Sequence, residues 1–458
     1  MARIFPFRAF HYDPTRVGVL DKVVTQPYDK ISDEMRERYY ASSPFNLARI
    51  VRGMQHPTDT EAENVYTRAQ KLLREWIKSG ILRQEDQPAL FAYFQEYELP
   101  AVPGKRLTRK GFIGIGKLGD YSSGVVFPHE QTLSGPKEDR LKLLRLTRAH
   151  FGQIFMLYAD PDRAVDAFLE EAALTAPDIR VTDEYGVVHS VWKITDPPRI
   201  SRIQQELEDK RLIIADGHHR YETALTFRDE CRTLQSGTAG PAAPGDLPPY
   251  EKVMMTFVNM ESEGLTILPT HRLVSNLPYF EMKDFLTRVQ WFFDLAGFKF
   301  FTPEERERKL EQFRRELHEV GQVIPSIGLR VAGTSNFYLM KLKGTLNLQQ
   351  LLPDVPERQH KLDVVILHKI VLERCLGISE EDIRSERYVR YIREFEGGLQ
   401  AVERKESQLA FFLNPTPIAQ VRDLAFAGER LPQKSTDFYP KLLSGLTMYQ
   451  LDSTDPAK

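Results

Sequence analysis

The sequence predicts a mixed α/β protein of the α+β type, because strand-like apolar segments and amphipathic helical segments are interleaved along the chain. Residues 89–99, ALFAYFQEYEL, have the aromatic-rich composition of a strand, whereas residues 65–76 place apolar side chains on one helical face. Residues 212–232 change from an apolar run to a helical pattern across one polar loop. With 458 residues, the chain is long enough for two or three domains.

The N-terminal third is expected to contain a helix and a hairpin. Thr60 and Glu63 have the spacing of a capping box, and Gly80 is a typical end for the helix that follows. The strand at 89–99 and the glycine-rich run at 111–119 flank PAVPGKR, which has the composition of a turn. We therefore predict a β-hairpin here.

The rest of the chain alternates between the two patterns. Residues 125–158 run from a strand end through a polar loop into a helix and a second strand. Residues 235–249 are rich in Gly, Pro and Ala, which predicts a flexible surface loop. Helical spacing is expected over 281–320 and 361–376, and residues 409–451 contain the strand LAFFL and a short helix.

Composition argues against nucleic-acid and membrane partners. The formal net charge is -2, so no global basic field exists to attract nucleic acid or an anionic membrane. The only cysteines, Cys231 and Cys375, form no CxxC pair, which favours a reducing compartment. No run approaches the roughly 18 apolar residues of a membrane span, and the N-terminus lacks a signal-peptide pattern. We expect a cytoplasmic protein.

The strongest functional pattern is LIIADGHHRYETAL, in which an apolar run ends at Asp216, Gly217, His218, His219 and Arg220. The first amides of a helix have no partner within it and lie at the positive end of its dipole, so this loop suits a phosphate. Histidine and arginine strengthen that preference, and arginine binds phosphate through two parallel hydrogen bonds.

Other interpretations of the loop remain open. Asp216 is a candidate Mg²⁺ ligand or partner for a histidine, but an aspartate here also caps helices, a contribution of about 1 kcal/mol. His218 and His219 are adjacent and cannot face one direction on regular structure. One of them is therefore expected to make a structural hydrogen bond.

Further polar motifs extend the candidate site. FPHEQT contributes His129 and Glu130, and Lys137 and Arg140 follow as candidate ligands for an anionic cofactor. The run GLTIL leads into a strand end, where ligand sites of open α/β sheets gather, and PQKST resembles a grip for an anion. The alternative for the first of these is an edge loop with solvated charge. Six residues are thereby assigned to substrate binding: Thr270, His271, Arg272, Lys434, Ser435 and Thr436.

The chain resembles the domain of unknown function 1015 family over its whole length. The motifs that carry the likeness are QPYDKI at 26–31, SPFNLARI at 43–50, FPHEQT at 127–132, IADGHHRYETAL at 214–225, LPTHRLV at 268–274 and LPQKSTDFYPKL at 431–442. The pairing of PHE with a later DGHHR is also similar to the ParB and sulfiredoxin-like superfamily, including its free-serine kinases.

These resemblances imply a ParB/sulfiredoxin-like core at 121–275, elaborated by α/β segments at 1–120 and 276–458. They imply that the DGHHR loop holds nucleotide phosphates, with ATP or ADP and Mg²⁺ as cofactors. The catalytic candidates are then Glu130 as general base, with Asp216, His218, His219 and Arg220. The cofactor-binding candidates are Gly217, His219, Arg220, Lys137 and Arg140, and Asp216 would contact the Mg²⁺.

The leading hypothesis is a nucleotide-dependent phosphotransferase acting on free serine or a similar hydroxyl metabolite, or running from phosphoserine in reverse. A metal-dependent hydrolase is a second hypothesis, with ligands drawn from His129, His218, His219 and His271. A non-catalytic, ParB-like regulator that binds nucleotide or DNA is a third.

Overall fold

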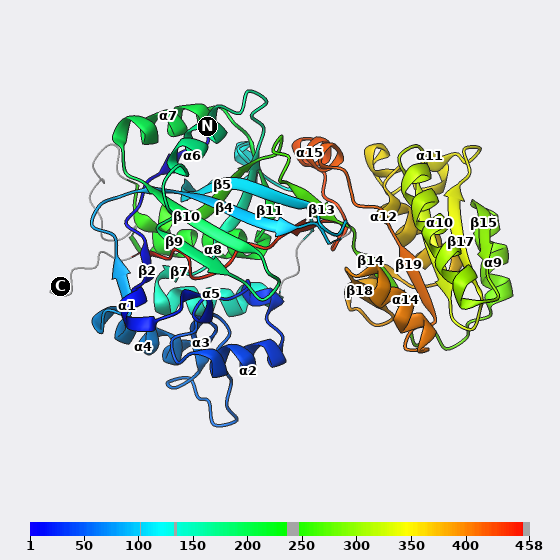
Figure 1. The fold of residues 1–458 in the computed structure, drawn as a ribbon, viewed down its shortest axis with the longest axis horizontal. Coiled ribbons are helices and arrows are strands. Elements are labelled where there is room, and N and C mark those ends of the chain that lie inside the picture. Colours follow the sequence, from blue (N-terminus) through cyan, green and yellow to red (C-terminus); the bar gives the residue numbers. More distant parts are fainter. Residues whose placement is uncertain (101, 132–134, 236–246, 452–458) are drawn as a thin grey trace. The chain divides into compact units, whose positions relative to one another are not determined.

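A computed structural model of the chain describes residues 1–100, 102–131, 135–235 and 247–451 (Figure 1). The predicted mixed α/β class is confirmed. The chain forms two compact units, which we describe separately: unit 1 comprises Met1–Pro128, Thr132–Thr266 and Pro440–Lys458, and unit 2 comprises His129–Gln131 and Ile267–Tyr439. This division differs from the expected one, since parts 1–120 and 121–275 share a unit to which the C-terminal segment returns.

Unit 1 is built on a mixed sheet. The described strands occur in the order β6-β11-β8-β12-β5-β4-β10-β9, with β1 also paired to β5. The pairs β6–β11 and β8–β12 are parallel, and the other pairs are antiparallel. The bounds are β1 Ile4–Phe5, β4 Leu90–Glu98, β5 Arg106–Lys117, β6 Val126–Pro128, β8 Ile154–Tyr158, β9 Ile179–Thr182, β10 Val188–Ile194, β11 Leu212–Asp216 and β12 Lys252–Asn259. Strands β4 and β5 form the predicted hairpin.

Helices cover this sheet and build a second cluster beside it. Side chains of α6, α7 and α8 join the sheet in one apolar core, while α2, α3 and α4 pack with the N-terminal segment in another. The bounds are α1 Pro14–Val17, α2 Asp33–Ser42, α3 Ala48–Val51, α4 Val65–Lys78, α5 Gly135–Thr147, α6 Ala164–Ala172, α7 Pro197–Glu208 and α8 His218–Gln235. Short strand pairs are β2 Phe10–Tyr12 with β3 Leu82–Gln84, and β7 Ala149–His150 with β21 Tyr449–Gln450.

Unit 2 is built on an antiparallel sheet with the order β15-β17-β16-β19-β14-β18. Aromatic and aliphatic side chains of α10 and α14 pack on it to form its core. The strand bounds are β14 His271–Val274, β15 Phe293–Lys299, β16 Ser326–Val331, β17 Asn336–Leu342, β18 Val389–Ile392 and β19 Leu409–Phe412; β13 Thr266–Leu268 pairs with β20 Asp437–Tyr439. The helix bounds are α9 Met282–Gln290, α10 Pro303–Gly321, α11 Leu348–Leu351, α12 Asp363–Ile366, α13 Glu380–Arg384, α14 Phe395–Glu403 and α15 Ile418–Phe426.

The structure corrects several local expectations. Helix α4 is capped by Asn64 with Thr67, and the bond from the Glu63 amide to the Thr60 hydroxyl lies before the helix. The segment 281–320 contains β15 between α9 and α10, because its aromatic run alternates as a strand does. The strand over 264–274 is split into β13 and β14 at Pro269 and Thr270.

Other expectations hold. The helical pattern over 361–376 is confirmed as α12 and a π-helical turn, Leu367–Cys375, and LAFFL forms β19 ahead of α15. Of the predicted loop at 235–249, residues 236–246 lie outside the described residues. Within the described ranges, none of the helices has both the length and the apolar character to cross a bilayer.

Candidate functional site

The DGHHR segment forms the predicted strand–loop–helix unit, with a single residue as the loop. Strand β11 ends at Asp216 and α8 begins at His218, three residues earlier than the sequence pattern suggested. Gly217 has φ +91°, which side-chain-bearing residues rarely adopt, and a Cβ there would lie 3.0–3.1 Å from guanidinium atoms of Arg220. The tight turn and the close approach of Arg220 both therefore require glycine.

Arg220 folds back over this turn. Its Nη2 donates to Oδ2 of Asp216 at 2.9 Å, and its Nη1 donates to the carbonyl of Gln153. The Arg220 side chain is 15% exposed and that of Asp216 is 23% exposed. The guanidinium is thus held at the start of α8 while its edge stays accessible.

Cationic groups surround Asp216. Nζ of Lys441 lies 3.3 Å from Oδ1 of Asp216, on the opposite oxygen from Arg220. Burial opposes ionisation, but the charges of Lys441, Arg220 and Lys30, with His218, hold the pKa of Asp216 well below its ordinary value. Asp216 is therefore ionised at neutral pH. Three side chains of fixed positive charge face one carboxylate, which leaves a positive surplus suited to a polyanion.

Lys30 and Lys441 were not among the sequence candidates. Both belong to motifs that carry the family resemblance, QPYDKI and LPQKSTDFYPKL, and this was the available signal. The first motif was interpreted as a turn around Asp29, and in the second Lys434 was chosen. Sequence alone does not tell which lysine of a motif reaches a carboxylate elsewhere in the chain.

A cavity of about 70 Å³ lies beside Arg220 within unit 1. Arg140 and Tyr28 line it, with the Arg140 guanidinium stacked 4.1 Å from the centre of the Tyr28 ring. Burial and the neighbouring charge of Asp29 raise the pKa of Tyr28 to about 12, so its hydroxyl stays protonated at neutral pH. Lys137, the other predicted cofactor ligand on α5, forms an ion pair with Glu222. The structure thus brings Arg140, but not Lys137, to the cavity that Arg220 lines.

The two histidines of the motif occupy the first two positions of α8 and are half-buried. His218 is one of the groups whose charge acts on Asp216.

The other candidates form a second group, in unit 2. Oε1 of Glu130 accepts the backbone N–H of Lys434 at 2.6 Å, and the carbonyl of Lys434 accepts from Nη2 of Arg272 at 3.0 Å. Arg272 is 1% exposed, and its Nη1 donates to the carbonyl of Thr270. Burial lowers the pKa of Arg272 to about 10, so it remains charged. Its guanidinium therefore holds two backbone segments together.

The PQKST loop is ordered by its own short-range contacts. Lys434 has φ +58° and an exposed side chain, whereas the Ser435 hydroxyl donates to the carbonyl of Pro432. The Thr436 hydroxyl lies 2.7 Å from Nε2 of His129, which is fully buried. These contacts place the predicted anion grip next to the PHE motif.

His271 lies in the core of unit 2. Its Nδ1 accepts the Leu413 N–H at 3.2 Å, and its ring packs edge-on against Phe395 and Phe412. Burial, with the charges of Arg272 and Arg314, lowers the pKa of His271 to about 3. The structure gives this residue a packing role in place of the expected contact with substrate.

The described part of the chain offers no group of three or more His, Cys, Asp or Glu side chains that could hold a metal ion. The four histidines considered for a hydrolase are divided, with His218 and His219 in unit 1 and His129 and His271 in unit 2. Neither unit by itself assembles the ligand set of that hypothesis. A Mg²⁺ ion bound through one carboxylate and substrate phosphates needs no such cluster.

The fold and site define a mixed α/β protein with a cationic turn between a sheet strand and a helix. Residues 4–365 match the family described as "Protein of unknown function (DUF1015)", and the chain belongs to this family. No curated protein matches the sequence.

Three solved structures are similar to the chain at low identity. A conserved hypothetical protein from Pyrococcus furiosus has 12% identity and a TM-score of 0.33, covering 71% of this chain and 92% of its own. A free serine kinase in complex with ADP has 11% identity and a TM-score of 0.34, with 71% and 87% covered. SbnI with a C-terminal truncation, from Staphylococcus aureus, has 11% identity and a TM-score of 0.33, with 75% and 90% covered.

Proposed function

We propose that the protein is a nucleotide-dependent phosphotransferase for a small hydroxyl metabolite, and that the turn from Asp216 to Arg220 binds the nucleotide phosphates. The observation that carries the proposal is the positive surplus around Asp216, where Arg220, Lys30 and Lys441 act on one carboxylate. Phosphoryl transfer depends mainly on positioning and on cations that neutralise charge on the phosphates. Free serine, or phosphoserine in the reverse direction, is the substrate that the sequence resemblance implies.

The residues of the turn suit distinct parts of this task. Arg220 presents a planar fork that matches two phosphate oxygens, and the first amides of α8 add N–H donors at the positive end of the dipole. Lys30 and Lys441 add point charges. Asp216, ionised at neutral pH, is the carboxylate that would contact Mg²⁺, which would neutralise charge on the phosphates.

The general base of the proposal is Glu130, a role implied by the sequence resemblance. Its carboxylate accepts the Lys434 amide through Oε1 and is 18% exposed. A carboxylate held by a backbone amide keeps a fixed orientation, which a base needs toward a substrate hydroxyl.

Calorimetric titration tests the phosphate site. ADP, ATP, CTP and pyrophosphate would be titrated into the full chain, with and without Mg²⁺. Arg220→Ala should weaken binding by about 30-fold or more, because a charge-assisted bidentate contact is lost. Arg232→Ala is the matched control, since Arg232 lies on the same helix and pairs with Glu251. Equal binding by wild type and Arg220→Ala, or no binding by wild type, would contradict the site.

Transfer of labelled phosphate tests the reaction separately. Wild type with Mg²⁺ and ATP should phosphorylate serine or another hydroxyl metabolite, or dephosphorylate phosphoserine onto ADP. Glu130→Gln should lower the turnover by a factor of about 10² or more while nucleotide affinity is kept. If a metabolite panel shows no transfer in either direction, the phosphotransferase is ruled out, whether or not nucleotides bind.

A further inference from the structure

A buried polar pair lies on one face of the unit 1 sheet. Gln95 on β4 and Arg109 on β5 are direct cross-strand partners, and each is 1% exposed. Ala92 and Phe94, which alternate with Gln95 along β4, belong to the apolar core on the opposite face. Nε of Arg109 donates to Oε1 of Gln95 at 2.9 Å.

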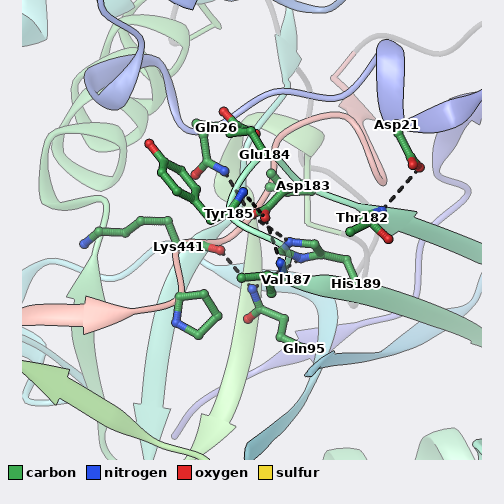
Figure 2. Close-up of polar contacts among 12 residues, drawn as sticks. Asp21, Gln26, Gln95, Thr182, Asp183, Glu184, Tyr185, Val187, His189 and Lys441 are labelled. Atoms are coloured by element: carbon green, nitrogen blue, oxygen red, sulfur yellow. Dashed lines mark hydrogen bonds and ion pairs between the residues drawn. The ribbon is translucent and has the colours of Figure 1, made fainter. Parts of the chain in front are cut away.

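This pair binds the backbone of the segment that carries Lys441. The Gln95 amide Nε2 donates to the carbonyl of Lys441 at 2.8 Å (Figure 2), and Nη2 of Arg109 donates to the carbonyl of Pro440. Consecutive carbonyls are thus held from one side, while the Lys441 ammonium extends to Asp216. Two directional bonds fix both the position and the rotation of this peptide.

The burial of Arg109 is costly unless its charge serves the fold or the site. Among the described residues Arg109 has no carboxylate at ion-pair distance, and its guanidinium stacks 4.5 Å from the ring centre of Phe155. Apolar side chains of similar size often give equal or greater stability at such positions. A buried polar pair adds directional placement of what it binds, and here it binds the backbone on either side of the Pro440–Lys441 peptide.

The same network anchors the segment that carries Lys30. Figure 2 shows Nε2 of Gln26 donating to Asp183 at 3.1 Å, and Asp183 lying 3.3 Å from His189. His189 Nδ1 in turn lies 3.3 Å from the Gln95 amide nitrogen. The backbones of Thr25 and Ser444 exchange two hydrogen bonds at 2.9 and 3.1 Å, so the two lysine-bearing segments are tied to each other as well.

We propose that Gln95 and Arg109 are positioning residues that hold Lys441 against Asp216, so that the cationic turn is preformed before any phosphate binds. The role of the turn in phosphate binding rests on the proposed function, but the placement of Lys441 is a property of the unliganded protein. It can therefore be measured without a ligand.

Lysine acetylation measures this placement directly. The unliganded full chain would be treated briefly with acetic anhydride, and the modification of each lysine followed by mass spectrometry. Gln95→Glu keeps an acceptor for Arg109 but removes the donor to the Lys441 carbonyl. Lys441 should then be acetylated about threefold faster or more, as its contact with Asp216 is lost. Arg109→Lys keeps the charge, removes the Pro440 contact and should act in the same direction.

Two controls separate positioning from general loosening. Gln204→Glu removes a similar bond, from Gln204 to the carbonyl of Ile4 at 2.6 Å, and should leave Lys441 unchanged. Lys210, which pairs with Asp160 at 3.8 Å in the same unit, is an internal reference whose rate should not change in any variant. An unchanged Lys441 rate in both Gln95→Glu and Arg109→Lys, or an equal rise at Lys210, would overturn the proposal.

Pyrophosphate titration then links placement to binding. Gln95→Glu should bind pyrophosphate about tenfold more weakly than wild type, and Gln204→Glu should bind it equally well. If Lys441 is released in Gln95→Glu while wild type binds no pyrophosphate, the proposed function fails and the positioning role stands. If pyrophosphate binds wild type and both variants equally, the positioning role fails and the phosphate site stands.

Discussion

Arg220 in unit 1 and Arg272 in unit 2 each follow a histidine in the sequence, yet they bind different kinds of partner. Arg220 contacts the carboxylate of Asp216 and one backbone carbonyl, and its side chain is partly exposed. Arg272 is fully buried and donates to the carbonyls of Thr270 and Lys434. An arginine whose donors are used by buried carbonyls stabilises a fold, whereas one that faces a carboxylate at an accessible turn is able to exchange that partner for a ligand.

The largest expected effect separates these two arginines by stability. Arg272→Ala leaves two carbonyls without their charged donor and opens space in unit 2, so we expect a loss of about 3 kcal/mol in its free energy of unfolding. Urea unfolding combined with hydrogen exchange in β14 and β19 measures the effect. Arg384→Ala, a substitution at an exposed arginine of the same unit that pairs with Glu380, should cost less than about 0.5 kcal/mol.

Pyrophosphate binding completes this comparison. Arg272→Ala should keep wild-type affinity, because the surplus of charge around Asp216 arises from unit 1 alone. The contrast between the two arginines would be wrong if Arg272→Ala left stability unchanged, or if Arg220→Ala destabilised the protein as strongly as Arg272→Ala.

A second effect separates two carboxylates by pH. Burial raises the pKa of Asp363 in unit 2 to about 7, against hydrogen bonds from Ser326 and Asn414. A carboxyl whose folded pKa is raised contributes stability below its unfolded pKa and loses it as the pH rises through the folded value. Unit 2 should therefore lose about 2 kcal/mol between roughly pH 4 and pH 8.

Asp216 should behave in the opposite way. Its folded pKa lies below the unfolded value, so its contribution is present above about pH 4 and is lost as the pH falls. Unfolding free energies of wild type and Asp363→Asn, measured across this range, check the sign. A variant that retains the full decline between pH 4 and pH 8 would show that another group causes it.

The sequence predicted the fold best where periodicity and turn chemistry agreed. The β4–β5 hairpin and the turn at Gly217 follow from local patterns, and both are confirmed. The strand β15 was missed because a seven-residue strand between two helices is easily taken for a helical continuation. Local pattern identifies an element more readily than its neighbours in space.

The candidate site shows the same limit. Asp216 and Arg220 were found because they are four residues apart across one turn. Lys441 reaches Asp216 from 225 positions away, and Gln95 reaches Lys441 from 346 positions away, so neither contact leaves a local signal. His271 was misjudged because a histidine beside an arginine gives no indication of its burial against Phe395 and Phe412.

The smallest expected effect concerns the charge balance at the turn. Asp216→Asn removes the one negative charge among Arg220, Lys441 and Lys30, so pyrophosphate without Mg²⁺ should bind about tenfold more tightly, or about 1.4 kcal/mol. The same variant loses the carboxylate that would contact Mg²⁺, so the gain in affinity that Mg²⁺ gives wild type should disappear. Asp229→Asn, in which an exposed partner of Arg228 on the same helix is changed, should leave both affinities as they are. Tighter binding without Mg²⁺ together with an unchanged Mg²⁺ effect would remove Asp216 from the metal role while keeping the phosphate role of the turn. Weaker binding in both conditions would mean that Asp216 mainly orders Arg220 and Lys441, and that the surplus of charge depends on their being held in place.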